Sequence, residues 1–233
     1  MSLILWAVLA CGQSAGENPS TAHLRNKPII LGNGQIYQGE PAFFRIIKRS
    51  DDLQNFGRLE AFIQGLDGAF KFYKSWDVCN YSGDLGPKLT EGDGQSPEGF
   101  YFAKRSSLNP NSSYHLSFNL GFPNAYDRAH GRTGSFLMVH GDCVSIGCYA
   151  MSNEGIEEIY TLLEQALDGG QDFVRVHIFP FEMTDENMTR YAENDNFEFW
   201  SNLKEGWDWF EVHGQPPNVT VENKHYSFNF DTL

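Results

Sequence analysis

From Ala42 onward, the sequence is divided into short runs of aromatic and β-branched residues, each bounded by turn-forming residues. "AFFRIIK", "RLEAFIQ" and "AFKFYKSWDVC" follow one another between Ala42 and Cys79. Runs of this kind are typical of β-strands, and Asp67-Gly68-Ala69 has the composition of a hairpin turn between the second and the third. The folded part of the chain is therefore predicted to begin as an antiparallel sheet.

Later in the chain the periodicity becomes that of a helix. In residues 152–170 apolar residues recur three or four positions apart, which predicts a helix capped by Ser152 and ended by Gly169 and Gly170. "DFVRVHIFPF" alternates as a strand, and "TDENMTRYA" begins with a threonine cap and acidic residues, as a helix does. We expect a helix with a break near Gly206 in "NFEFWSNLKEGWDWFEV", and a strand pair in "NVTVENKHYSFN".

The middle of the chain combines loops with single strands. "NYSGDLGPKLTEGDGQSPEGFYFAK" is predicted to be a Gly- and Pro-rich loop ending in a strand, "SYHLSFNLGF" a strand, "PNAYDRAHGRTG" a polar loop, and "SFLMVH" a buried strand. Many short strands followed by helices predict an α+β fold with a mainly antiparallel β-roll or sandwich and flanking helices. We assign residues 42–182 to one catalytic domain, 183–233 to a helical and strand extension packed on it, and 17–41 to a linker or arm.

The first residues have the character of an export signal. Leu3–Ala10 is an unbroken apolar run, too short to cross a bilayer, and small residues follow it, so residues 1–16 are predicted to be a signal peptide or a lipoprotein signal. "VLAC" also resembles a bacterial lipobox, which would make Cys11 a lipidated N-terminus. We therefore expect an exported, periplasmic protein without a transmembrane span.

Composition excludes some partners. The formal net charge is −13 and the chain has no run of Lys or Arg, so we expect neither nucleic-acid binding nor attachment to an anionic membrane surface. We also expect a monomer.

Chemistry is concentrated in "FLMVHGDCVSIGCYAM". His140 ends an apolar strand, and Cys148 follows Gly147 directly before the predicted helix. A helix N-terminus would favour the thiolate of Cys148, and the N–H groups of Gly147 and Cys148 could receive an oxyanion. The residues thus suggest a nucleophilic cysteine with a histidine base.

Three other interpretations remain open at this point. His140, Asp142, Cys143 and Cys148 could hold zinc, although Cys-x4-Cys with one histidine is an incomplete set. A Cys143–Cys148 disulfide would close a very small loop. Cys148 could also be an inert core residue, because unpaired cysteines are often buried. Removing the signal leaves Cys79, Cys143 and Cys148, an odd number that suggests one pair and one thiol.

This segment resembles the L,D-transpeptidase family, which has the YkuD fold. His140-Gly141, Ser145-x-Gly147-Cys148 and Met151 match its motif, and Ser96-Pro97-Glu98-Gly99-Phe100-Tyr101 matches its "TPxGxF/Y" strand. "CNYSGDLGPK", "GFPNAYDRAHGR" and "FPFEMTDENM" are similar, in the same order, to the YafK-like branch. Relative to typical members, the loop before the cysteine is short, and Ile146 and Ala150 stand where polar residues are frequent.

The resemblance implies a cysteine enzyme that needs no metal or cofactor and acts on peptidoglycan stem peptides. Cys148 would be the nucleophile, His140 the base, a backbone carbonyl near Gly141 the orienting group, and Gly147 part of the oxyanion site. Cys79 and Cys143 would then be the disulfide pair. The YafK-like branch implies a hydrolase that releases peptidoglycan-linked lipoprotein. An L,D-transpeptidase and a non-catalytic peptidoglycan-binding module are the alternatives.

A substrate loop is predicted from its charges. Arg128 could bind a stem-peptide carboxylate and Asp127 an ammonium group, with Tyr126, His130 and Ser145 beside them. A solvated loop with a local Asp–Arg pair is the equally favoured alternative. His130 is the rival base, since it also precedes a glycine.

Overall fold

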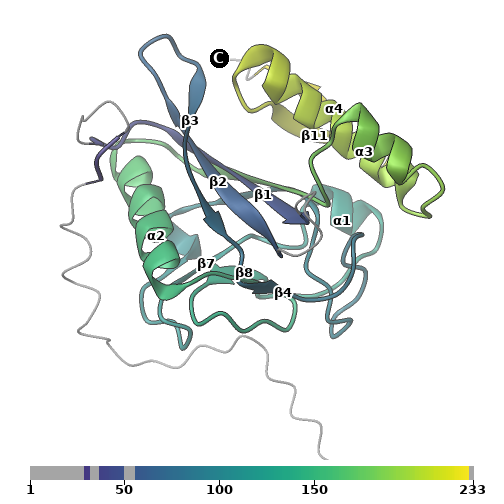
Figure 1. The fold of residues 1–233 in the computed structure, drawn as a ribbon, viewed down its shortest axis with the longest axis horizontal. Coiled ribbons are helices and arrows are strands. Elements are labelled where there is room, and N and C mark those ends of the chain that lie inside the picture. The colour runs from purple at the N-terminus through teal and green to yellow at the C-terminus, as the bar shows by residue number, and fades with distance from the viewer. Residues whose placement is uncertain (1–28, 32–36, 50–55, 231–233) are drawn as a thin grey trace, which may run out of the picture.

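The computed structural model describes residues 29–31, 37–49 and 56–230, and it has the predicted α+β fold. The described chain forms two five-stranded sheets, a two-stranded sheet and helices packed around them (Figure 1). Most strand pairs are antiparallel; β1 with β10 and β8 with β9 are parallel. No helix among the described residues is long and apolar enough to span a membrane.

The main sheet has the strand order β3-β2-β1-β10-β5. The expected hairpin lies between β2 and β3, where the Gly65 N–H donates to the Ala69 carbonyl at 2.8 Å. The strands of this sheet are β1 (Ala42–Arg49), β2 (Phe56–Gln64), β3 (Phe70–Asp77), β5 (Gly99–Ala103) and β10 (Val174–Phe179).

The smaller sheet lies below the main sheet in Figure 1 and has the order β4-β9-β8-β7-β6. Its strands are short: β4 (Asn80–Tyr81), β6 (Leu108–Asn109), β7 (Ser117–Asn119), β8 (Met138–His140) and β9 (Tyr149–Ala150). A 3₁₀ turn, η2 (Arg105–Ser107), precedes β6. The strand expected in "SYHLSFNLGF" is thus confined to β7.

Each face of the main sheet packs against a different layer. Phe44 and Ile46 of β1 point into a core shared with the smaller sheet and with α2 (Asn153–Asp168). Ile47 points into a second core, formed with the C-terminal segment. The helix α2 is capped by the Ser152 hydroxyl, as expected, which accepts from the Gly155 N–H.

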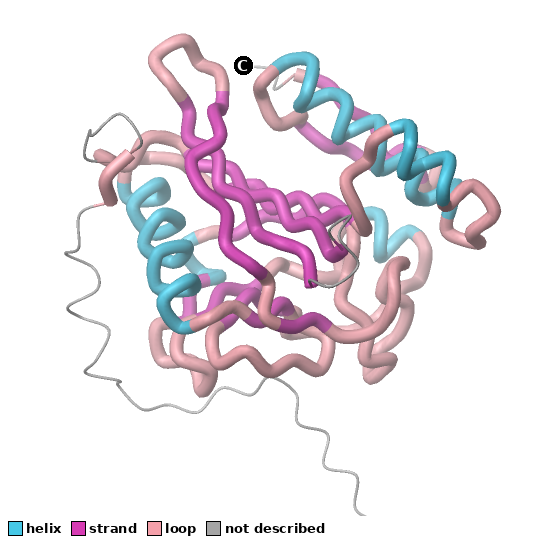
Figure 2. The backbone as a smooth tube through the Cα atoms, viewed as in Figure 1, coloured by secondary structure: helices cyan, strands magenta, loops and turns pink. Residues whose placement is uncertain are grey.

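The C-terminal segment covers the outer face of the main sheet. It contains α3 (Asp185–Arg190), α4 (Phe197–His213) and the hairpin of β11 (Asn218–Glu222) and β12 (His225–Asn229) (Figure 2). The expected break near Gly206 is wrong, because α4 is continuous through it. A Cβ on Gly206 would lie 2.4 Å from Phe100 and 2.6 Å from Phe228, so this glycine permits close packing.

The segment 123–134 is also more ordered than a polar loop. Ala125–Ala129 forms the short helix α1, whose N-cap is Asn124, and Tyr126 and Asp127 are buried in it. The alternative of a solvated loop is wrong for Tyr126 and Asp127, which are buried against Tyr226 and Tyr101, although the local Asp–Arg pair that it included is present as Asp127 with Arg132.

At the N-terminal end, Ile29 and Tyr37 belong to the central core, so packed structure begins before Ala42. The signal assigned to residues 1–16, including Cys11, lies outside the described residues, as does most of the arm 17–41.

Candidate active site

The candidate catalytic residues share one face of the smaller sheet. Phe118, Val139 and Tyr149 lie side by side and point into the central core. Their neighbours Ser117, His140 and Ala150 are also paired across the strands, and therefore lie on the opposite face. Cys148 directly precedes β9 and lies two residues before Ala150, so extending the alternation of β9 by one residue places it on the same side of the sheet as His140.

His140 is held in one orientation by its own backbone. Its Nδ1 lies 2.6 Å from the Gly141 carbonyl oxygen, which only accepts hydrogen bonds, so Nδ1 carries the proton and Nε2 is the basic nitrogen. The ring packs against Tyr114 with centroids 4.7 Å apart. Burial lowers the pKa of His140, and the bond to Gly141 opposes this shift, so the imidazole is neutral at neutral pH.

Position 141 has no room for a side chain, which requires glycine. A Cβ there would lie 2.6 Å from Asn153 Oδ1 and 3.0 Å from the Tyr114 carbonyl oxygen, while the Gly141 N–H donates to that same carbonyl. A larger residue would displace the carbonyl that orients His140.

Cys148 is buried and is not in a disulfide. Its thiol donates toward the Phe136 carbonyl at 3.8 Å, and its own carbonyl accepts hydrogen bonds from Ser96 and Ser145 at 3.0 and 2.7 Å. The backbone of the proposed nucleophile is therefore fixed by two hydroxyl groups.

The expectation that Cys148 begins a helix is wrong. Cys148 leads into β9, which pairs with both β8 and β4, and α2 starts only at Asn153. No helix dipole therefore acts at the thiol. Gly147 has φ +112°, which favours glycine, and in the described chain its N–H makes no hydrogen bond, so it can serve an oxyanion.

Cys79 and Cys143 form a disulfide. It links the start of β4 to the loop between His140 and Cys148, and the Cys79 N–H donates to the Ala150 carbonyl at 2.8 Å. Since Cys143 is bridged to Cys79, it forms no small disulfide with Cys148 and offers no thiolate to a metal. Among the described residues there is no group of three His, Cys, Asp or Glu side chains that could hold a metal ion.

Sequence reasoning did not identify the support beneath this loop. Lys48 is fully buried, and its ammonium group donates to the Asp84 and Ser96 carbonyls at 2.9 Å and to Glu98 at 3.1 Å. Trp200 donates to the other oxygen of Glu98. These bonds fix the segment that carries Ser96. The family motif at Ser96–Tyr101 was the one sequence signal that could have pointed to this support.

The predicted substrate residues fall into two groups. Asp127 accepts from Tyr101 and Arg132, both at 2.9 Å, and is fully buried. Tyr126 stacks between His130 and Tyr226 with centroids 4.1 and 4.2 Å apart. Both are thus committed to packing.

Arg128 and His130 remain exposed on α1. Arg128 donates to the Pro123 carbonyl, and His130 Nδ1 lies 3.0 Å from the Tyr126 carbonyl oxygen. Ser145 holds the Cys148 carbonyl and accepts from Ser82 at 3.2 Å, which makes it a positioning group for the nucleophile.

Ser117 was missed by sequence reasoning. It is fully buried opposite His140 in β7, and its hydroxyl has no hydrogen-bond partner among the described residues. Nothing in its sequence context distinguishes it from an ordinary strand serine.

The fold, a carbonyl-oriented histidine in β8 and a buried thiol directly before β9 are the features expected of the L,D-transpeptidase class. The sequence profile of the YkuD family, the L,D-transpeptidase catalytic domain, matches residues 74–206. Because this match covers more than half of the chain, the protein belongs to that family. It is an L,D-transpeptidase-type enzyme, and the family implies a peptidoglycan substrate.

Individual proteins are also similar to this chain. YafK of Escherichia coli K12, named as a candidate L,D-transpeptidase, is 48% identical over 226 residues, which cover 97% of this chain and 87% of YafK. YafK of strain O157:H7 matches equally. Among solved structures, the helical cell shape determining protein Pgp2 of Campylobacter jejuni has a TM-score of 0.45 at 19% identity, covering 87% of this chain and 79% of Pgp2. Bd1075 of Bdellovibrio bacteriovorus has a TM-score of 0.40 at 15% identity, covering 81% of this chain and 84% of Bd1075.

Proposed function

We propose that this protein is a cysteine hydrolase of peptidoglycan that cuts the amide bond between the L-centre of diaminopimelate and the lysine of a covalently attached lipoprotein. The observation that carries the cysteine chemistry is the 2.6 Å bond from His140 Nδ1 to the Gly141 carbonyl. It leaves Nε2 as the basic nitrogen, and the proposal is that this nitrogen serves Cys148, which directly precedes the strand paired with β8.

The reaction proceeds through a thioester. Rotation of the Cys148 side chain away from the Phe136 carbonyl brings the thiol to His140 Nε2, which takes its proton. The thiolate attacks the amide carbonyl, and the Gly147 N–H donates to the resulting oxyanion. As the carbon–nitrogen bond breaks, His140 protonates the departing amine. Water, deprotonated by His140, then splits the thioester into a carboxylic acid and the thiol.

Water is the proposed acceptor because of the surroundings of the nucleophile. The loop from His140 to Cys148 is short, Ile146 is 80% exposed, and Ala150 is fully buried. Neither Ile146 nor Ala150 offers a charged group to hold a second stem peptide as acceptor. The resemblance to the YafK-like branch supports the same choice. The runner-up is transpeptidation, in which an amine resolves the thioester.

The proposed substrate determines the location. Peptidoglycan with attached lipoprotein lies outside the cytoplasmic membrane, so we place the enzyme in the periplasm, consistent with the signal expected in residues 1–16.

The test is incubation of the protein with sacculi that carry covalent lipoprotein, followed by detection of released lipoprotein. We expect release by the wild type and none by Cys148→Ala or His140→Gln. The matched control is His130→Gln, which should retain activity. Loss in His130→Gln with retention in His140→Gln would make His130 the base, and release by Cys148→Ala would overturn the thioester mechanism.

A second experiment distinguishes water from an amine as the group that resolves the thioester. Adding a free D-amino acid to the same assay should leave the muropeptides unchanged if water resolves the thioester. Muropeptides carrying the added amino acid would identify a transpeptidase.

A further inference from the structure

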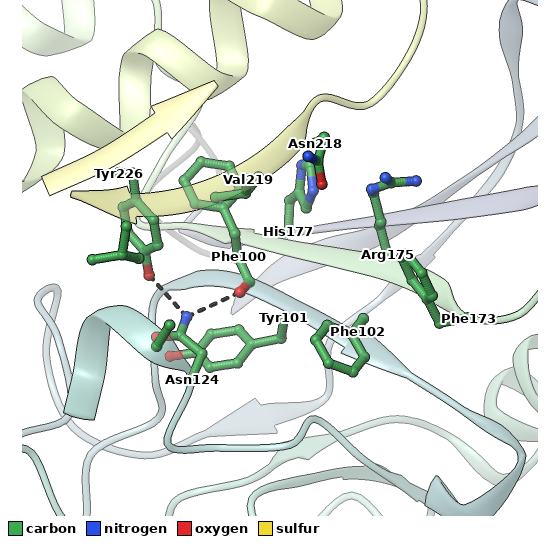
Figure 3. A pocket seen from close by; sticks show the side chains of 12 residues that line it. Phe100, Tyr101, Phe102, Asn124, Phe173, Arg175, His177, Asn218, Val219 and Tyr226 are labelled. Atoms are coloured by element: carbon green, nitrogen blue, oxygen red, sulfur yellow. Dashed lines mark hydrogen bonds between the residues drawn. The ribbon is translucent and has the colours of Figure 1, made fainter. Parts of the chain in front are cut away.

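A cavity lies on the face of the main sheet that packs against the C-terminal segment. It has a volume of about 160 Å³ and is bordered by β5, β10 and the hairpin of β11 and β12. Its walls are largely aromatic (Figure 3), and its polar lining groups are Asn124, Arg175, His177 and Asn218. Arg175 and His177 alternate with Val176, which points into the central core, so this cavity opens on the side away from Cys148.

His177 is the unusual group in this cavity. It is 1% exposed, and its ring lies 4.7 Å from the rings of both Phe43 and Phe100. In the described part of the chain neither of its ring nitrogens makes a hydrogen bond. A buried polar group without a partner costs stability, and it commonly marks a place where a ligand or water completes the bonding.

The described lining of the cavity includes a basic residue and no acidic one, although the protein is acidic. The chain has 30 acidic and 17 basic residues, yet the twelve residues described as lining this cavity include Arg175 and no Asp or Glu. Burial lowers the pKa of His177 well below its usual value, and the charges of Arg175 and Arg45 lower it further. The cavity therefore disfavours a cation and favours an anion.

The other polar lining groups differ in what they can offer a ligand. Asn124 is fully committed, because its amide donates to the Phe100 carbonyl and the Tyr226 hydroxyl, both at 2.9 Å, as Figure 3 shows, and its oxygen accepts from the Asp127 N–H. Arg175 lies over the ring of Phe173, 5.0 Å from its centroid. A guanidinium beside a neutral imidazole N–H is suited to the two oxygens of a carboxylate.

We propose that this cavity binds a small organic carboxylate with an apolar body. The carboxylate contacts Arg175 and the His177 N–H, and the body lies among Phe100, Phe102 and Val219. The size is appropriate, because a cavity of about 150 Å³ accommodates a benzene ring. The carboxylate belongs either to a free acid or to the end of a peptide, and the site is independent of the proposed chemistry at Cys148.

The experiment is titration of the protein, labelled with ¹⁵N on its backbone and histidine rings, with phenylacetate and, separately, with N-acetyl-D-alanine. Each probe has a neutral control, phenylacetamide and N-acetyl-D-alaninamide. We expect shifts of the His177 ring and of the Val219 amide, with a dissociation constant of about 1 mM or tighter for at least one acid. Its amide should bind about tenfold more weakly or not at all. Preference for the first acid indicates a free acid, and preference for the second a peptide end.

Variants test the contacts. Arg175→Gln, at a partly exposed position, should weaken binding about tenfold, whereas Arg190→Gln on α3 should not change it. Cys148→Ala should bind as the wild type does, which separates this proposal from the catalytic one. Equal binding of acid and amide, shifts that map elsewhere, unchanged affinity in Arg175→Gln, or no binding by either acid up to about 20 mM would each overturn the proposal.

Discussion

Two buried histidines on opposite sides of the main sheet make a direct comparison. His140 and His177 are each 1% exposed, and burial lowers the pKa of both. His140 has a carbonyl acceptor at 2.6 Å, and its strand pairs with β9, which Cys148 directly precedes. His177 lies among phenylalanines, without a hydrogen bond in the described chain. Burial alone therefore does not distinguish the proposed base from the other histidine; the orienting acceptor does.

The largest expected difference between the two regions is in turnover. Cys148→Ala and His140→Gln should each lower kcat/KM for lipoprotein release at least about 1000-fold, because each removes a participant in proton transfer or bond formation. His177→Gln should leave kcat/KM within about threefold. Circular dichroism and the unfolding midpoint of each variant check that it is folded. Comparable losses at His140 and His177 would remove the functional distinction between them.

The next largest effect concerns the disulfide beside the catalytic loop, which has no equivalent on the His177 side. Cys79 and Cys143 are 64 residues apart, and releasing a loop of that size should lower the free energy of unfolding by about 2–4 kcal/mol. The double variant Cys79→Ser/Cys143→Ser should show this in urea unfolding followed by tryptophan fluorescence. The cavity behind the main sheet should keep its ligand affinity, since the disulfide lies in the other layer. Equal loss in both regions would show that they are not independent.

The sequence predicted elements whose causes are local. The first three strands and the hairpin at Asp67–Ala69 follow from alternating residues between turn residues. The cap at Ser152 could be predicted because its hydroxyl stands where the helical spacing of apolar residues begins. The proposed nucleophile and base, Cys148 and His140, were selected by spacing and by the family motif.

The features that could not be predicted depend on contacts between remote parts of the chain. Asp127 is buried because Tyr101, which is 26 residues away in the sequence, packs on it and donates to its carboxylate. Cys148 leads into a strand because Tyr149 and Ala150 pair with β4 and β8, and two residues are too few to show a period. The cavity at His177 needs β5, β10 and β11, which are brought together only by the tertiary fold.

A smaller effect is expected at Ser117, whose hydroxyl lies opposite His140 without a partner among the described residues. If the hydroxyl contacts the substrate or the attacking water, Ser117→Ala should lower kcat/KM about tenfold. It should not reduce stability, because removing an unsatisfied buried hydroxyl relieves a desolvation cost. Ser113→Ala, on the exposed turn before β7, is the control for a serine without this placement. Unchanged kinetics in Ser117→Ala would exclude a role in the reaction.

The smallest effect concerns pH. Both histidines should make the free energy of unfolding depend on pH, whereas only His140 should make the activity depend on pH. Both have folded-state pKa values below the unfolded value of about 6.5, so below that pH the unfolded chain binds protons that the folded chain does not. Stability is therefore complete above about pH 6.5. It falls as the pH drops toward the folded-state values, by at most about 1.4 kcal/mol per pH unit for each histidine.

His177→Gln should remove one histidine's share of this slope below about pH 6.5, measured by urea unfolding at closely spaced pH values. The acid limb of kcat/KM should remain, since it reports protonation of His140, which must be neutral to act as the base. If His177→Gln instead moved the acid limb of kcat/KM, the two sides of the sheet would be electrostatically coupled. The separation of one catalytic histidine from one ligand-binding histidine would then fail.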